Sequence, residues 1–231
     1  MAKLLGDAGL PTTTLSLSIQ PLLVKEGDRL LLFDTGAGKF MGPGAGQLST
    51  SLQDANASPA AVSDIFISHA HGDHVGGLLT DSGELAFPNA TIHMSAAEWK
   101  SLQGTDQMAP LVKAITPKVK SFSPGSVLLP NLVKAVEIKG HTPGHSGYLI
   151  GTGADTLLYV GDSVHHSIVS VQEPDWTIAF DGDAPTAQAS RKAMLEQNAA
   201  SGQRIYAVHF PFPGLGKFEK QGEKIVWTPE R

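Results

Sequence analysis

The sequence predicts an α/β fold in a single domain that covers residues 1–231. Two observations lead to this expectation. Apolar segments of strand length alternate along the chain with segments of helical composition. The expected strands also end in loops that carry His or Asp, which is how a rigid scaffold usually presents a functional site. A chain of 231 residues is long enough to bury the core of such a domain.

Two paired strands are expected near the N-terminus. Residues 15–19 alternate polar and apolar side chains with a period of two, and residues 29–33 form a continuous apolar run typical of a buried strand. The polar residues 26–28 supply the turn between them. A helix is expected over residues 47–57, after a glycine-rich loop.

The rest of the chain continues the alternation. Further strands are expected at residues 65–67, 91–94, 133–138, 156–160 and 205–208, with an edge strand at 225–227. Ser95 and Glu98 form a capping-box pattern that opens a helix through Leu102. Asp183 precedes a longer helix over residues 185–200, which is rich in good helix formers.

The composition excludes several classes of protein. The formal net charge of −5 argues against binding of a nucleic-acid backbone, which usually needs a basic face. The absence of cysteine excludes disulfides and thiolate metal sites, so any metal ion must be held by His and carboxylate. No apolar run approaches the length needed to cross a bilayer. We therefore expect a soluble protein, cytoplasmic if the chain is complete, and periplasmic or secreted if a signal peptide was removed.

Four potential metal ligands fall within six positions, directly after the expected strand at residues 65–67. They are His69, His71, Asp73 and His74. In a loop, this spacing lets the side chains converge on more than one metal ion. Neutral imidazole and carboxylate suit zinc, and they also suit iron, manganese or cobalt.

This run has the H-x-H-x-D-H pattern that follows a strand in the metallo-β-lactamase superfamily, and the sequence resembles that family. The family also has a later His, an Asp and a last His, each in a loop after a strand. His145, Asp162 and His209 occur here in that order. The resemblance covers almost the whole chain. It implies a four-layer αββα sandwich, in which two mixed β-sheets are flanked by helices.

The resemblance also implies two divalent metal ions, with zinc first among the candidates. One ion is expected on His69, His71 and His145. The other is expected on Asp73, His74 and His209, with Asp162 bridging the two ions. Hydroxide held by both ions would attack the substrate, while the ions stabilise the negative charge that develops. Asp73 and Asp162 are therefore candidate catalytic residues as well as ligands.

Further residues are candidates for supporting roles. Asp34 matches a family position that supports the ligands, because a ligating His usually donates its other N–H to such a group. His141 is expected to support the site from its loop, since the resemblance gives the ligand role to the second His of the H-T-P-G-H segment. His165 is a third candidate catalytic residue that would steady the substrate carbonyl; the alternative is that His165 and His166 are surface histidines.

Three apolar side chains are candidate walls of a substrate pocket: Phe40, Met41 and Trp99. An apolar substrate needs an apolar cleft beside the polar centre. A single Trp on an amphipathic helix, however, belongs more often to the core.

Two segments resemble the branch that contains methyl parathion hydrolase and its lactonase relatives. They are residues 85–90, Leu-Ala-Phe-Pro-Asn-Ala, and residues 209–214, His-Phe-Pro-Phe-Pro-Gly. This implies hydrolysis of a lactone of the acyl-homoserine lactone type or a related ester, with organophosphate triester cleavage as a side activity. Ala70 and Gly72 depart from the parathion-hydrolysing pattern.

Other functions share parts of this pattern. A glyoxalase II type thioesterase has the same ligands but needs a basic patch for the carboxylates of glutathione. The acidic balance disfavours a ribonuclease Z type nuclease, and a β-lactamase proper has little support. A flavodiiron redox module would place Glu where this chain has His71. The partners expected are a small-molecule substrate, no nucleic acid and no membrane, and the relatives imply a homodimer.

Overall fold

The contacts of the chain group it into two compact units. Unit 1 contains Met1–Gln20 and Leu129–Arg231, and unit 2 contains Pro21–Leu128. The computed structural model describes residues 1–42 and 44–230, so Pro43 of the glycine-rich loop and Arg231 lie outside the described residues. The single domain predicted over residues 1–231 stays a prediction. No helix in the described ranges has the length and apolar character that a membrane span requires.

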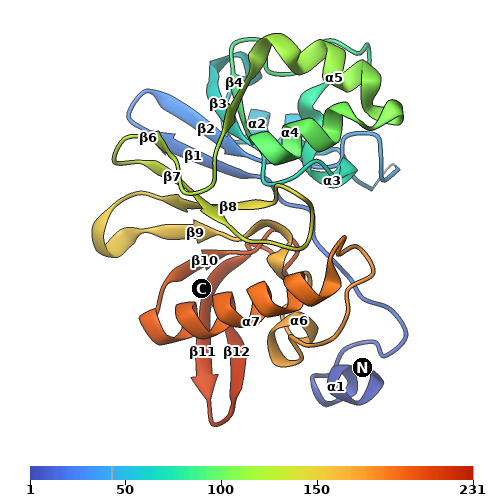
Figure 1. Ribbon diagram of the computed structural model, residues 1–231, viewed down its shortest axis with the longest axis vertical. Helices are drawn as coiled ribbons and strands as arrows, with labels where there is room; N and C mark the ends of the chain where they lie inside the picture. The colour runs from blue at the N-terminus through green and yellow to red at the C-terminus, as the bar shows by residue number, and fades with distance from the viewer. Residues whose placement is uncertain (43, 231) are drawn as a thin grey trace. The chain divides into compact units, whose positions relative to one another are not determined.

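The described residues of unit 2 form a mixed sheet of five strands (Figure 1). In order across the sheet the strands are β1 (Leu22–Glu26), β2 (Arg29–Phe33), β3 (Val62–Phe66), β4 (Thr91–Ser95) and β5 (Val119–Phe122). β1 and β2 are antiparallel, while β2 to β5 run parallel to one another. The carboxyl ends of β2 and β3 therefore lie at the same edge, where the chain continues into Asp34 and Ser68.

Helices complete unit 2. They are α2 (Leu48–Asp54), α3 (Gly72–Val75), α4 (Ala96–Gln103) and α5 (Ala109–Ile115), with short 3-10 turns η1 (Pro59–Ala61), η2 (Gly76–Leu78), η3 (Asp106–Met108) and η4 (Thr116–Lys118). Ile65 and Ile92 of the strands share a core cluster with Leu102 and Ile115 of the helices. Burial of these apolar side chains fixes α4 and α5 on the sheet.

A second mixed sheet of the described residues has seven strands, of which β7 to β12 belong to unit 1 and β6 spans the boundary between the units. In order they are β12 (Lys224–Pro229), β11 (Leu215–Gln221), β10 (Arg204–Tyr206), β9 (Leu157–Tyr159), β8 (Ser146–Ile150), β7 (Val133–Glu137) and β6 (Val127–Leu129). β9 and β10 are parallel, whereas β8 is antiparallel to both β7 and β9. The loops after β7, β9 and β10 consequently leave the sheet at one edge.

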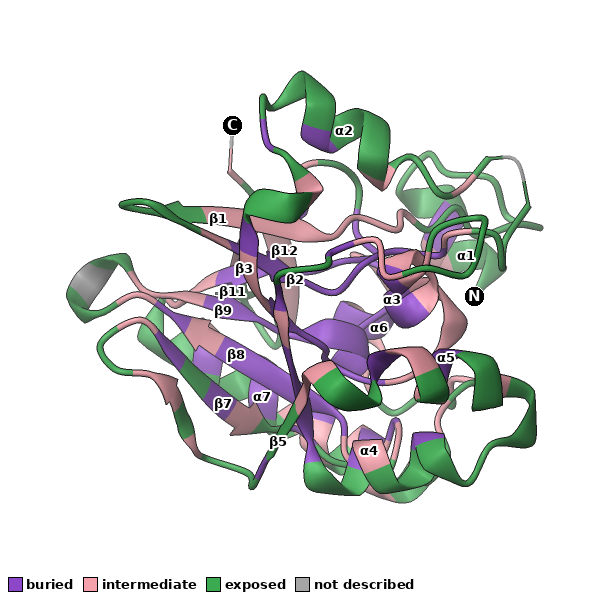
Figure 2. Ribbon diagram, turned by 90° about the horizontal axis from the view of Figure 1, so that it is seen from above, coloured by how far each residue is buried: buried purple, intermediate pink, exposed green. Residues whose placement is uncertain are grey.

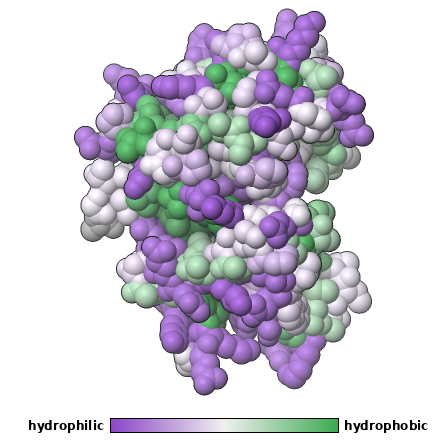
Figure 3. All heavy atoms as spheres, in the orientation of Figure 1, coloured by the Kyte–Doolittle hydropathy of each residue, from purple (hydrophilic) through white to green (hydrophobic). Residues whose placement is uncertain are grey.

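Unit 1 also contains α1 (Ala2–Asp7), α6 (Val169–Gln172), α7 (Ala184–Ser201), η5 (Gly153–Asp155) and η6 (Gly161–Ser163). The long helix α7 packs against β11 and β12 (Figure 1). Its Met194 and Leu195 join Leu158 and Ile205 of the sheet in one core cluster. Figure 2 shows that most residues of β8 and β9 are buried. Hydrophilic residues gather at the exposed turn between β11 and β12 (Figure 3).

Most of the expected elements are confirmed with small differences at their ends. The strand expected at residues 15–19 is wrong, because β2 pairs with β1 instead and residues 15–19 contain no strand. β1 lies next to the tight turn at Gly27 and Asp28, so the hairpin closes with little loss of loop entropy. Both expected caps are confirmed: Ser95 Oγ accepts from the N–H of Glu98, and Asp183 accepts from the N–H of Thr186.

Candidate metal centre

The metal-binding run of unit 2 lies between the end of β3 and helix α3. His69 and His74 are fully buried, and their ring centroids are 4.0 Å apart. His69 Nε2 is 3.0 Å from Nδ1 of His71, and Asp73 Oδ2 is 3.5 Å from Nε2 of His74. The loop thus brings its four potential donors together within one unit.

Asp34 supports this run from the end of β2. It has a left-handed backbone conformation, with φ of 56°, which a short polar residue tolerates better than most. Its Oδ1 accepts from the N–H of Ser68 at 2.7 Å, and its Oδ2 accepts from the Ser68 hydroxyl at 2.6 Å. The same Oδ2 is 2.7 Å from Nδ1 of His74. His74 therefore carries its proton on Nδ1 and presents the lone pair of Nε2, which is the form that binds metal.

In unit 1 three histidines surround the carboxylate of Asp162, which follows β9. His141 Nε2 lies 3.4 Å from Asp162 Oδ2, His165 Nε2 lies 3.2 Å from the same oxygen, and His209 Nε2 lies 3.1 Å from Oδ1. Potential ligand atoms of Asp162, His165 and His209 all lie within 4.8 Å of one another. All four residues are buried.

His209 shows why this arrangement suits a cation. Its Nδ1 is 2.7 Å from the carbonyl oxygen of Ser18, which can only accept, so Nδ1 carries the proton. Its Nε2 then faces the carboxylate of Asp162, 3.1 Å from Oδ1. Two acceptors at this distance repel each other unless a proton or a metal ion lies between them. The N–H of Ser18 also donates to the carbonyl of His209, and Gln20 Nε2 donates to that of Phe210, which holds the loop in place.

His141 repeats this pattern. Its Nδ1 is 2.9 Å from Asp181 Oδ1, and its Nε2 faces Asp162. Asp181 also accepts from the buried guanidinium of Arg191 at 2.8 Å. Burial alone would raise the pKa of Asp181, but the hydrogen bond with His141 and the positive charge of Arg191 outweigh burial and lower that pKa. Asp181 is thus a stable anion that fixes the His141 ring.

The two histidines of the H-T-P-G-H segment differ in the described partners of their ring nitrogens, and the roles assigned to them from the sequence stay predictions. His145, the expected ligand, has its Nδ1 2.9 Å from the carbonyl of Ile138, and its Nε2 accepts from the N–H of Asp162 at 2.9 Å. His141, expected only to support the site, has the ring nitrogen that faces the Asp162 carboxylate.

His165 and His166 are both buried, so they are not surface histidines. His166 Nδ1 accepts from the N–H groups of Ile168 and Val169, and burial lowers the pKa of His166, which keeps the ring neutral. Its position next to α6 is structural. His165 differs, because within the described residues neither of its ring nitrogens makes a hydrogen bond, although Nε2 faces Asp162.

The three candidate pocket residues separate into two groups. Phe40 and Met41 are more than half exposed. The ring of Phe40 packs so closely on Gly72 that a Cβ there would lie 3.2 Å from it. An apolar surface therefore borders the metal-binding run of unit 2. Trp99 is partly buried and packs against the core cluster of the same unit, which favours the core alternative given for it.

Sequence reasoning missed three charged residues that hold these loops. Asp181 and Arg191 lie far along the chain from His141, and no local motif marks them. Glu98 was read only as a helix-capping residue, yet its buried carboxylate accepts from the N–H of Ala70 inside the His run.

Comparisons with known proteins agree with this chemistry. The sequence profile of the metallo-beta-lactamase superfamily matches residues 18–209. One similar solved structure is AidC, a dizinc quorum-quenching lactonase in complex with the product N-hexnoyl-L-homoserine. It has a TM-score of 0.93 and 33% sequence identity, and the match covers 100% of this chain and 85% of that chain. Another similar structure is that of the hydrolase AbOPH of the beta lactamase superfamily, with a TM-score of 0.88 and 29% sequence identity. The match covers 100% of this chain and 86% of that chain.

The uncharacterized protein YobT of Bacillus subtilis (strain 168) is 29% identical over 136 residues, which are 55% of this chain and 54% of that protein. The matched part thus spans about half the length of this curated relative. The predicted fold, with two mixed sheets and flanking helices, is confirmed. On the profile match and the likeness to AidC, the chain belongs to the metallo-beta-lactamase superfamily.

Proposed function

We propose that the chain hydrolyses the ester bond of a lactone of the acyl-homoserine lactone type, using two divalent metal ions. One observation carries the proposal: His74, His141 and His209 each have Nδ1 next to a protein oxygen and Nε2 facing a carboxylate. A ring whose Nδ1 donates to a protein oxygen can present Nε2 to a metal ion, which supports these three residues as ligands. The similarity to AidC, a dizinc lactonase, supports both the metal and the substrate class.

The proposed ligands follow the sequence-based sets, with one exchange. His69, His71 and His141 would hold one ion, with His141 in place of His145. Asp73, His74 and His209 would hold the other ion, and the carboxylate of Asp162 would serve both. Imidazole and carboxylate without thiolate fit zinc first, and also manganese, iron or cobalt.

When bound, such ions lower the pKa of water and stabilise the oxyanion of the developing tetrahedral carbon. The residues of the chain supply orientation and proton transfer. Asp162 and Asp73 are acceptors for the proton of the attacking water. His165, buried and with ring nitrogens available, donates a hydrogen bond to the lactone carbonyl oxygen. The ring C–O bond then breaks, and the leaving alkoxide takes the proton that the carboxylate accepted from the water, which gives the ring-opened hydroxy acid.

Phe40 and Met41 are proposed to contact the acyl chain. Both are exposed apolar side chains, and the Phe40 ring lies directly on Gly72 of the metal-binding run. Contact with such surfaces contributes roughly 0.8 kcal/mol for each CH₂ group that is fully buried. Longer acyl chains should therefore lower KM more than they change kcat.

A four-substrate assay tests the proposal. The purified protein is loaded with zinc, its metal content is measured, and turnover of N-hexanoyl-homoserine lactone, a phosphotriester, an aryl ester and S-lactoylglutathione is compared. We expect two ions per chain and the highest kcat/KM for the lactone, with the phosphotriester as a side activity. Turnover of the thioester alone would establish the glyoxalase II type alternative. Two bound ions without turnover of any substrate would reject the substrate class.

A further inference from the structure

The loop between the end of β3 and the start of α3 carries His69 and His71, two of the proposed ligands. Among the contacts described here, three hydrogen bonds hold its backbone. The N–H of Ile67 donates to the carbonyl of His93 at 2.9 Å, and the N–H of Ser68 donates to Asp34. In the third, the N–H of Ala70 donates to Glu98 Oε1 at 2.8 Å.

Glu98 is unusual for a glutamate on a helix because it is only 2% exposed. A carboxylate buried to this degree is costly unless hydrogen bonds replace its water. Its backbone N–H closes the cap with Ser95 at 3.2 Å, so the first turn of α4 fixes where its side chain begins. α4 in turn packs on β4. The carboxylate is thus aimed at Ala70 from a rigid element, not from a mobile surface chain.

Ala70 is the residue between His69 and His71, two of the proposed ligands. Adjacent side chains of an irregular loop point where the backbone directs them, so a fixed amide at Ala70 restricts both neighbouring rings. Asp34 gives the corresponding restraint at Ser68 and His74. Glu98 supplies a restraint at the part of the run that Asp34 does not contact through any hydrogen bond described here.

We propose that Glu98 is a positioning residue of the metal centre, which sets the geometry of His69 and His71 by anchoring the amide of Ala70. This inference rests on the proposed function. It gives the carboxylate of Glu98 a role at the His run, in addition to the cap of α4 in which the Ser95 hydroxyl accepts from the Glu98 N–H. A ligand-orienting contact of this kind typically changes metal affinity by about 10–100-fold.

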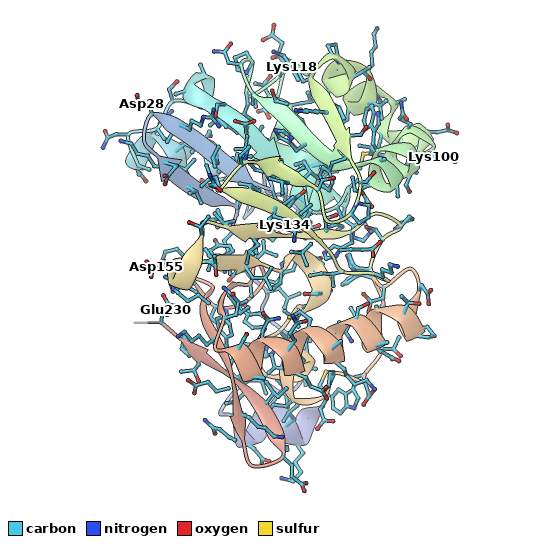
Figure 4. The ribbon with its side chains drawn as sticks, turned by 60° about the vertical axis from the view of Figure 1, so that its left-hand side comes forward. Asp28, Lys100, Lys118, Lys134, Asp155 and Glu230 are labelled. Atoms are coloured by element: carbon cyan, nitrogen blue, oxygen red, sulfur yellow. The ribbon has the colours of Figure 1, made fainter. Side chains whose placement is uncertain are left out.

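Variants of the full chain separate positioning from capping. Glu98→Ala removes the acceptor. Glu98→Asp keeps a carboxylate and a helix-compatible side chain but retracts the acceptor by one CH₂ group. Glu98→Gln keeps an acceptor oxygen at the original reach. Ser95→Ala is the matched control, because it removes the cap of the same helix and leaves the contact with Ala70. Lys100→Ala, at an exposed position of α4 labelled in Figure 4, controls for any change on this helix.

The readouts are the zinc dissociation constant from chelator competition, the Tm of the metal-free protein and kcat/KM for the lactone. We expect Glu98→Ala and Glu98→Asp to weaken zinc binding by about 10–100-fold, and Glu98→Gln to restore most of that loss. Ser95→Ala should lower Tm with no change in zinc affinity, and Lys100→Ala should change neither. Amide exchange of Ala70 should speed up in Glu98→Asp but not in Ser95→Ala.

Unchanged zinc affinity in Glu98→Asp and Glu98→Ala would overturn the positioning role and leave the proposed function intact. Should Glu98→Ala fail to fold, the Glu98→Asp and Glu98→Gln pair decides the question alone. A wild-type chain that binds no metal ion would instead overturn the proposed function, and the positioning role with it. The two failures are therefore told apart by the wild-type titration.

Discussion

The two units prepare histidines for the same chemistry in different ways. In unit 2 the four candidate ligands are close in sequence, and one loop between β3 and α3 places them. In unit 1 His141, Asp162 and His209 come from three loops at one edge of the sheet, and Asp162 is their common partner. Local sequence therefore determines the first group, whereas strand order and side-chain hydrogen bonds determine the second.

The groups that hold the histidines in place also differ between the two units. Asp34 holds Ser68 and His74 together from a neighbouring parallel strand. In unit 1 the corresponding task is divided, because Asp181 orients His141 and the carbonyl of Ser18 orients His209. Removal of Asp34 should thus disturb Ser68 and His74 together, while damage to the anchors of unit 1 should separate into individual effects.

The largest effect is expected from Asp162→Ala. Asp162 faces three histidines, so its removal takes away the shared carboxylate of unit 1. Loss of groups that merely orient ligands already costs about 10–100-fold, so kcat/KM should fall by more than this, with loss of bound metal. Metal analysis together with lactone turnover measures both. Two ions and full activity in this variant would contradict the central role of unit 1.

The next effect distinguishes His141 from His145. His141→Ala should lose metal and most activity, because its Nε2 faces Asp162. His145→Ala should retain the metal ions but have a free energy of unfolding that is lower by about 1–3 kcal/mol. The reason is that the carbonyl of Ile138 and the N–H of Asp162 lose the hydrogen bonds that they make with His145. Denaturant unfolding and metal content are measured on both. The reverse result would restore His145 as the ligand.

A smaller effect compares the two anchoring carboxylates. Asp34→Ala and Asp181→Ala should each weaken metal binding by about 10–100-fold. Asp34→Ala should be the more severe, because Asp34 holds Ser68 as well as His74, and chelator competition ranks the two. Equal losses would mean that the additional contact with Ser68 has no effect on the ligands.

The smallest effect lies away from the ligands, at the pair of Asp64 and His93 in unit 2. Burial tends to raise the pKa of Asp64, but the hydrogen bond with His93 at 2.8 Å, the one from Ser63 and the charge of Arg29 lower it below the ordinary value of 3.8. A carboxyl with a lowered folded-state pKa stabilises the fold above its ordinary pKa, and this contribution disappears as pH falls through the lowered value.

Asp64→Asn should therefore reduce the free energy of unfolding of the metal-free protein by about 1–3 kcal/mol near pH 7. The difference from wild type should stay constant down to about pH 5 and shrink below 3.8. Urea unfolding at a series of pH values measures it. A difference that grows as the pH falls would contradict the assigned direction.

The sequence predicted the features that depend on local pattern. The strands at β2, β3 and β4, the caps at Ser95 and Asp183, and the grouping of His69 to His74 were all readable, because periodicity, capping and spacing act over a few residues. The partner of β2 was predicted wrongly because residues 15–19 have the alternation of a strand but no buried face, with Leu15 and Leu17 both exposed.

The ring-nitrogen partners of His141 and His145 could not be predicted from the sequence, for a different reason. Both belong to one short segment, and only the partners of their ring nitrogens distinguish them. Those partners, Asp181 and Ile138, are set by how the loop leaves β7 and meets the chain before α7. Arg191 and Glu98 were missed similarly, since a buried charge is recognised by its contacts and not by its neighbours in sequence.

The most direct test is an anomalous-scattering map from crystals of the zinc-loaded protein, recorded on both sides of the zinc edge. Two zinc peaks are expected beside Asp162, with His141 Nε2 bound to one and His209 Nε2 to the other, while His145 keeps its contacts with the backbone of Ile138 and Asp162. A single peak, no peak at Asp162, or a zinc ion bound by His145 would contradict the proposed two-metal centre.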